Sequence, residues 1–151
     1  MLVLRRSHYL VPAPPNGPVF HAATFLHRSS GWGAARTFSK FNRRVEAQLT
    51  TTPGALAYSV QRLAIGREFW TLSLWADRAS MLAFVRAGDH RVAADWLKEP
   101  GRPDGQFAQW EAPTASLRWE EAYTRLGTPA PKGRVLTAPN PVPAGWRTVP
   151  R

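Results

Sequence analysis

The stretch EFWTLSLW (68–75) constrains the fold of this chain more than any other segment. Successive side chains of a strand point to opposite faces of a sheet. The two sets of alternate side chains here are Phe69, Thr71, Ser73 and Trp75 on one face, and Trp70, Leu72 and Leu74 on the other. Both sets are largely apolar, and an apolar face needs a covering layer. We therefore expect a sheet that is covered on both sides.

The other predicted elements follow this strand in a regular order. Strands are predicted over 19–28, 55–63, 68–75 and 106–113, with an amphipathic helix before the TTPG break at 51–54, a helix after the capping residue Asp77, and a helix over 116–126. The order is that of the ferredoxin-like split βαβ arrangement, an α+β fold with a four-stranded antiparallel sheet. Such a sheet carries its helices on one face, so we expect a homodimer in which two sheets pack face to face into a barrel.

The two ends of the chain differ in composition from its centre. Proline and glycine are frequent over 10–18 and 127–151, which predicts an extended N-terminal segment (1–18), a folded domain (19–126) and a proline-rich tail (127–151). The net charge of +10 resides at the ends: +6 over 1–50 (7 − 1), 0 over 51–126 (9 − 9) and +4 over 127–151 (4 − 0). The aromatic residues of the first helix fall opposite its basic residues, which argues against a nucleic-acid partner.

The location expected for the protein follows from what the sequence lacks. Cysteine is absent, which excludes disulfides and thiolate metal sites and fits a reducing compartment. No apolar run has the length of a signal peptide core or a membrane span. We expect a soluble cytoplasmic protein without a membrane partner.

Three segments, PGALAYSVQRL, EFWTLSLWADRASMLAFVRAGDHRVAADW and FAQWEAPTASLRWEEAYTRL, carry a family resemblance. Together they resemble the dimeric α+β barrel superfamily of the antibiotic-biosynthesis monooxygenases, and within it the spheroidene monooxygenase-like branch. The matching positions are Trp70, Thr71, Ser73, Trp75, Phe84, Gly88 and His90. The resemblance spans roughly 19–126 and implies the fold derived above. It leaves the activity open, because the superfamily includes haem proteins, cofactor-free oxygenases, cyclases and isomerases.

His90 is the main candidate for chemistry, because it directly follows a break at Gly88-Asp89 in an otherwise continuous helical pattern. If Asp89 caps a second helical segment, His90 lies in the first turn, where the positive end of the helix dipole disfavours the imidazolium. A neutral imidazole can ligate a haem iron, accept a proton, or serve as a buried structural histidine. In the haem proteins of the superfamily an axial histidine occurs on this helix. All three roles remain open, and the structural role is the commonest for a lone histidine.

The polar strand face of 68–75 is the second candidate, because two hydroxyls among aromatic side chains resemble a small-molecule pocket. The residues expected to line this substrate pocket are Tyr58, Phe69, Thr71, Ser73, Trp75, Phe84 and Trp110. On the first helix, Arg36 and Arg43 could bind the carboxylates of a haem or of an acidic substrate.

The function hypothesis is a small homodimeric enzyme of the monooxygenase-like class acting on a hydrophobic metabolite, with haem dependence slightly favoured and His90 as axial ligand. One alternative is a cofactor-free cyclase, isomerase or oxygenase in which His90 transfers a proton. A second alternative is a non-enzymatic haem- or ligand-binding protein.

Overall fold

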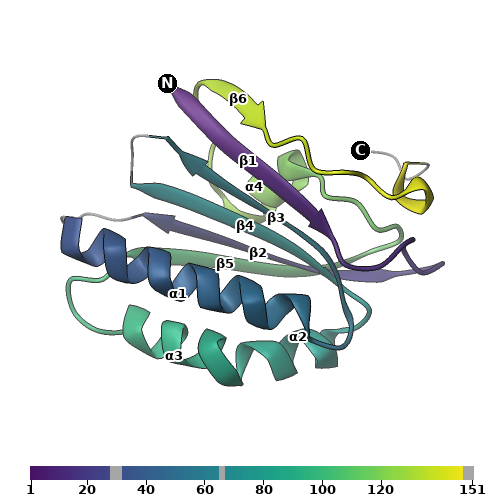
Figure 1. Cartoon of the computed structure of the whole chain (residues 1–151), viewed down its shortest axis with the longest axis horizontal. Coiled ribbons are helices and arrows are strands. Elements are labelled where there is room, and N and C mark those ends of the chain that lie inside the picture. Colours follow the sequence, from purple (N-terminus) through teal and green to yellow (C-terminus); the bar gives the residue numbers. More distant parts are fainter. Residues whose placement is uncertain (28–31, 65–66, 148–151) are drawn as a thin grey trace.

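The structure, a computed structural model, describes residues 1–27, 32–64 and 67–147; Arg28, the last residue of the first predicted strand, lies outside these ranges. Within them the chain forms one sheet and its covering helices (Figure 1). The strands are β1 (Leu2–Tyr9), β2 (Val19–His27), β3 (Ala55–Leu63), β4 (Glu68–Trp75), β5 (Asp104–Ala112) and β6 (Arg134–Thr137). The helices are α1 (Trp32–Thr50), α2 (Arg78–Val85), α3 (Gly88–Leu97), α4 (Trp119–Leu126) and the 3-10 turn η1 (Ala144–Trp146).

The sheet has the strand order β5-β2-β4-β3-β1-β6. The four strands β5, β2, β4 and β3 each pair antiparallel with their neighbours and form the predicted ferredoxin-like unit. The prediction of a four-stranded antiparallel sheet is nevertheless wrong, because the sheet has six strands and is mixed. β1 pairs antiparallel with β3, and β6 pairs parallel with β1. Both added strands come from the segments that flank residues 19–126.

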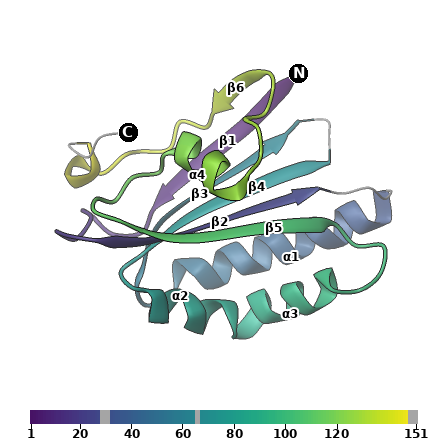
Figure 2. The same cartoon turned by 180° about the vertical axis from the view of Figure 1, so that it is seen from behind.

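Helices cover both faces of the sheet, as the apolar pattern of β4 predicts. The helices α1, α2 and α3 lie on one face, whereas α4 and the end of the chain lie on the other (Figures 1 and 2). The packed side predicted for α4 is buried in full: Trp119, Ala122, Tyr123 and Leu126. The expectation of helices on one face only is therefore wrong. The chain itself covers the face that we assigned to a second copy, and the homodimer stays a prediction.

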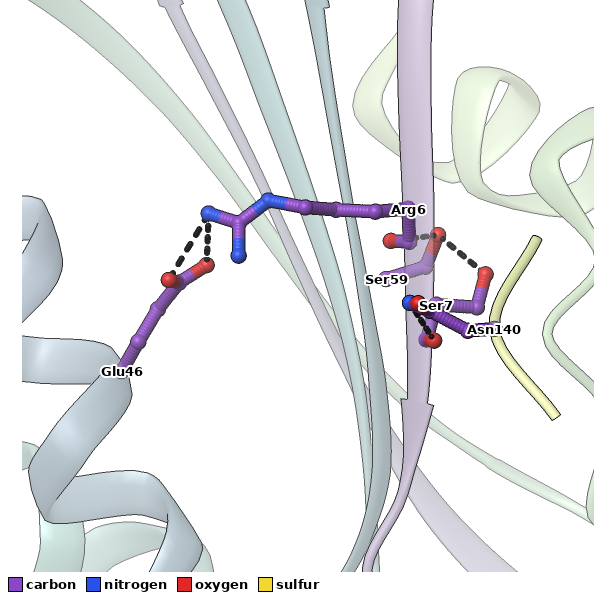
Figure 3. A network of polar contacts seen from close by, with 5 residues as sticks. All are labelled: Arg6, Ser7, Glu46, Ser59 and Asn140. Atoms are coloured by element: carbon purple, nitrogen blue, oxygen red, sulfur yellow. Dashed lines mark hydrogen bonds and ion pairs between the residues drawn. The ribbon is translucent and has the colours of Figure 1, made fainter. Parts of the chain in front are cut away.

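Successive side chains of β1 point to opposite faces of the sheet and contact the layers that cover both faces (Figure 3). On the α1 side, Arg6 Nη2 donates to both carboxylate oxygens of Glu46 at 2.7 and 2.8 Å. On the opposite side, Ser7 Oγ donates to Ser59 Oγ at 2.9 Å, and Asn140 Nδ2 donates to the carbonyl of Ser7 at 2.7 Å. One strand from the start of the chain thus holds both α1 and the C-terminal segment.

The longest helix, α1, is amphipathic in the predicted sense. Phe38 contacts Phe69 of β4 and Phe41 contacts Trp96 of α3, with ring centroids 5.1 and 5.3 Å apart. Its basic side chains, Arg36, Lys40, Arg43 and Arg44, are exposed. Across the described ranges, none of the helices combines the length and the apolar character needed to cross a bilayer.

Candidate functional site

A cavity of about 550 Å³ lies between the sheet and the helices α1, α2 and α3. The alternation of β4 builds its floor, because the side chains opposite Trp70, Leu72 and Leu74 point toward these helices. Seven residues singled out in the sequence line it: Tyr58, Phe69, Thr71, Ser73, Trp75, Phe84 and His90. The structure therefore brings together the strand face and the histidine that the sequence left as separate candidates.

His90 enters the cavity wall from the first turn of α3. Its Nδ1 lies 3.1 Å from the carbonyl oxygen of Val85, and its ring lies 4.9 Å from that of Phe84. A carbonyl only accepts hydrogen bonds, so Nδ1 carries the proton. Burial lowers the pKa of His90, while the hydrogen bond to Val85 partly opposes this shift. His90 is therefore a neutral imidazole, and its Nε2 has no hydrogen-bond partner in the described part of the chain.

Gln48 of α1 fixes the position of this imidazole. Its Oε1 accepts a 2.8 Å hydrogen bond from the backbone N–H of His90. Its Nε2 donates to the carbonyls of Phe84 and Ala87 at 3.2 and 3.0 Å. One side chain thus satisfies backbone groups on both sides of the break between α2 and α3. No feature of the sequence around Gln48 pointed to this role.

The predicted break is confirmed, but Asp89 does not cap α3. The helix begins at Gly88, its N-cap residue is Ala87 without a side-chain hydrogen bond, and Asp89 lies within the first turn. Gly88 has φ +55°, a left-handed conformation that glycine adopts without steric cost. The tertiary contact from Gln48 replaces the local cap that we expected.

Polar groups on the cavity floor are oriented by neighbours. Trp75 Nε1 donates to Ser73 Oγ at 2.9 Å, and Ser73 Oγ lies 3.4 Å from the carbonyl of Ala22. Thr71 pairs across the strands with Thr24, which also lines the cavity. The result is a mostly apolar, aromatic pocket with a few hydroxyl groups, the usual composition of a small-molecule site.

Tyr58 adds a phenol next to the Arg6–Glu46 pair. Burial raises its pKa to about 12, with a further increase from the Glu46 carboxylate and a decrease from Arg6. Its ring stacks on that of His8 with centroids 4.8 Å apart. Burial, with a smaller contribution from Arg6, lowers the pKa of His8. At neutral pH the Tyr58 hydroxyl therefore keeps its proton and is available as a hydrogen-bond donor.

Three predicted site residues lie outside the cavity. Trp110 points to the opposite face of the sheet, where it stacks on His21 with centroids 5.2 Å apart. The pairing of His21 with Trp110 sets this orientation, because the two side chains share a face. Arg36 lies outside both the cavity and the neighbouring groove, and Arg43 lines the groove only.

The described residues around the cavity include no preformed cluster for a metal ion. Among the residues described, no group of three or more histidine, cysteine, aspartate or glutamate side chains lies close enough to hold one. His90 is thus a single nitrogen donor.

Comparison with known proteins identifies the fold. Residues 33–96 match the family model described as antibiotic biosynthesis monooxygenase. SnoaB, a cofactor-independent oxygenase from Streptomyces nogalater, is similar in a mutant form over 67% of this chain and 98% of its own, with 14% identity and a TM-score of 0.50. An antibiotic biosynthesis monooxygenase structure is similar over 64% of this chain and 99% of its own, with 15% identity and a TM-score of 0.52.

A protein from Deinococcus radiodurans, assigned provisionally to the same monooxygenases, is similar over 64% of this chain and 95% of its own, with 21% identity and a TM-score of 0.53. No curated protein matches the chain. The match over residues 33–96 and the shared fold agree with the predicted superfamily, and its fold is confirmed. The spheroidene monooxygenase-like branch stays a prediction.

Proposed function

From the match of residues 33–96 to the antibiotic biosynthesis monooxygenase family model and from the shared fold, we propose that the chain is an oxygenase whose hydrophobic, aromatic substrate binds between the sheet and α1–α3. The observation that supports this most directly is the geometry of His90. With Nδ1 committed to the carbonyl of Val85, Nε2 is a lone-pair acceptor on the wall of an aromatic cavity. Such a group is suited to general base catalysis at neutral pH.

The proposed step is removal of a proton from an acidic phenol or activated methylene by His90 Nε2. The substrate anion lies against Trp75 and Phe69, while the hydroxyl group of Tyr58 donates to one of its oxygen atoms. An electron-rich anion of this kind can reduce molecular oxygen directly. For an activated methylene the balance is CH₂ + O₂ → C=O + H₂O, so the substrate supplies every electron and no further reductant is needed.

Oxygen consumption tests this proposal. An anthrone, which has an activated methylene between aromatic rings, is incubated with the protein while dissolved oxygen and quinone absorbance are recorded. We expect His90→Ala to lower kcat at least 100-fold, the usual range for loss of a general base. The exposed Val92→Ala on the same helix serves as the control. Equal rates for the wild type and His90→Ala would exclude His90 as the base.

Haem dependence is the second candidate, and one observation favours it. A ligating histidine usually donates its other ring nitrogen to a carbonyl, as His90 does to Val85. His90 Nε2 would hold the iron, and the haem would supply oxygen activation. We rank it second because Arg36 and Arg43, the predicted partners of the haem carboxylates, do not line the cavity. Titration with haemin tests it: a Soret shift in the wild type that is absent in His90→Ala supports ligation, and identical spectra exclude it.

A non-enzymatic ligand-binding role is the remaining alternative. Binding of the anthrone without oxygen uptake, in the wild type and in His90→Ala alike, would favour this role over catalysis.

A further inference from the structure

A groove of about 1340 Å³ lies between α1 and the sheet edge formed by β1 and β6. One wall comes from α1 through Phe38, Asn42 and Arg43, and the other comes from β1 and β6 through Leu4 and Leu136. The side chains of Val60 and Phe69 contribute to its apolar lining. The groove therefore lies next to the cavity, and α1 and the side chains of the sheet that face it line both spaces.

The groove is continuous with the cavity. Six residues line both spaces: Leu26, Phe38, Asn42, Val60, Phe69 and Pro103. Five of these six side chains are apolar. A ligand with an apolar body can therefore extend from the cavity into the groove without crossing a polar barrier.

The charges that line the groove are strongly unbalanced. Among the described residues that line it, one is acidic, Glu68, and five are arginines: Arg5, Arg6, Arg43, Arg62 and Arg67. The Oε1 atom of Glu68 lies 3.8 Å from Nδ1 of His27. Two of the arginines have evident structural roles, because Arg5 donates to Gln61 at 2.8 and 2.9 Å and Arg6 pairs with Glu46.

Arg43 and Arg62 differ from these two in being exposed. Neither forms an ion pair within the ranges that the structure describes. Their guanidinium groups remain available for planar hydrogen bonding to an anion. The cavity has no such excess of arginines, because its charged lining residues are Glu46 and Lys98, and each is already in an ion pair.

We propose that the cavity and the groove form one site for an amphipathic organic anion. The apolar body occupies the cavity, and the anionic head, a carboxylate or phosphate, lies in the groove against Arg43 and Arg62. This inference rests on the proposed function, since it names the substrate class of that same cavity. It also fixes the orientation of the ligand, with its uncharged end toward His90.

Two fluorescent probes with the same aromatic body test the charge requirement. 1-Anilinonaphthalene-8-sulfonate carries an anionic group, and N-phenyl-1-naphthylamine lacks it. We expect the wild type to bind the sulfonate about tenfold more tightly. Arg43→Gln and Arg62→Gln should each weaken sulfonate binding about threefold, as is typical for one partly exposed ionic contact, and should leave binding of the neutral probe unchanged. Added salt should reduce the preference.

The matched control is Arg44→Gln, because Arg44 is the exposed neighbour of Arg43 on α1 and lines neither space. Displacement of the sulfonate by decanoate or by decyl phosphate identifies the head group that is preferred, and displacement by neither would overturn the proposal. Equal affinity for both probes would overturn the anionic specificity alone. Absence of binding of either probe would also remove the basis of the proposed function.

Discussion

The contact between Gln48 and the α2–α3 break leads to a quantitative prediction. Gln48→Ala removes three hydrogen bonds, to the N–H of His90 and to the carbonyls of Phe84 and Ala87. Each is worth about 0.5–1 kcal/mol when water can partly replace the partner, which gives about 1.5–3 kcal/mol. Release of the side chain returns up to about 1 kcal/mol of rotamer entropy. We expect a net loss of about 1–2 kcal/mol in the free energy of unfolding.

The assay combines urea denaturation with NMR titration of the His90 ring. A loosened break admits water to His90, which relieves the burial that lowers its pKa, so this pKa should rise toward 6.5. Gln48→Glu keeps the acceptor for His90 but loses both donors, and its effect should be intermediate. Lys40→Ala, an exposed change on the same helix, is the control. A loss below about 0.5 kcal/mol together with an unchanged pKa of His90 would refute the assigned role of Gln48.

Further predictions concern pH and the packing of the second layer. Burial lowers the pKa of His8, His21 and His90, so between pH 6.5 and their folded-state pKa values the unfolded chain binds more protons. The free energy of unfolding should therefore fall as pH drops from 7 to 5, and a flat urea midpoint over this range would contradict the shifts. Trp119→Phe removes the 3.2 Å hydrogen bond to Ser59 and part of a buried ring, and should cost about 1–2 kcal/mol in urea denaturation. Gly88→Ala places a Cβ 3.1 Å from the Gln48 amide at φ +55°, and should lower the thermal midpoint through a cost of about 1–2 kcal/mol; an unchanged midpoint would argue against strain.

Local periodicity predicted the parts of the fold that depend on neighbouring residues. The alternation of 68–75 identified the two faces of β4 correctly, because side-chain direction in a strand follows from position alone. Asp77 caps α2 as expected, with its carboxylate accepting from the N–H of Ser80 at 2.7 Å. The packed side of α4 also followed from helical spacing, although α4 begins at Trp119 and not at residue 116.

Features that depend on distant pairing were not accessible in this way. The strands β1 and β6 were not predicted, because arginines in 1–18 and prolines in 127–151 are untypical of strands. Both segments become strands through pairing, β1 with β3 and β6 with β1. Gln48 contributes to the site from a position 42 residues before His90, and no local sequence pattern indicates this contact. Trp110 was assigned to the wrong face because its orientation depends on the register with β2.

The pairing of β6 with β1 joins Leu2 to Arg134, positions that are 132 residues apart in the chain (134 − 2). Pairing these two strands closes a long loop, which costs conformational entropy, and the four exposed residues of β6 gain little free energy in return. We therefore expect the β1–β6 pair, the corner of the sheet, to form late in folding and to open early. Leu4 and Leu136 both line the groove, and they are paired only when this corner is closed. A molecule held in the groove therefore binds the closed form preferentially. Occupancy of the site and the docking of the two ends of the chain are thermodynamically linked.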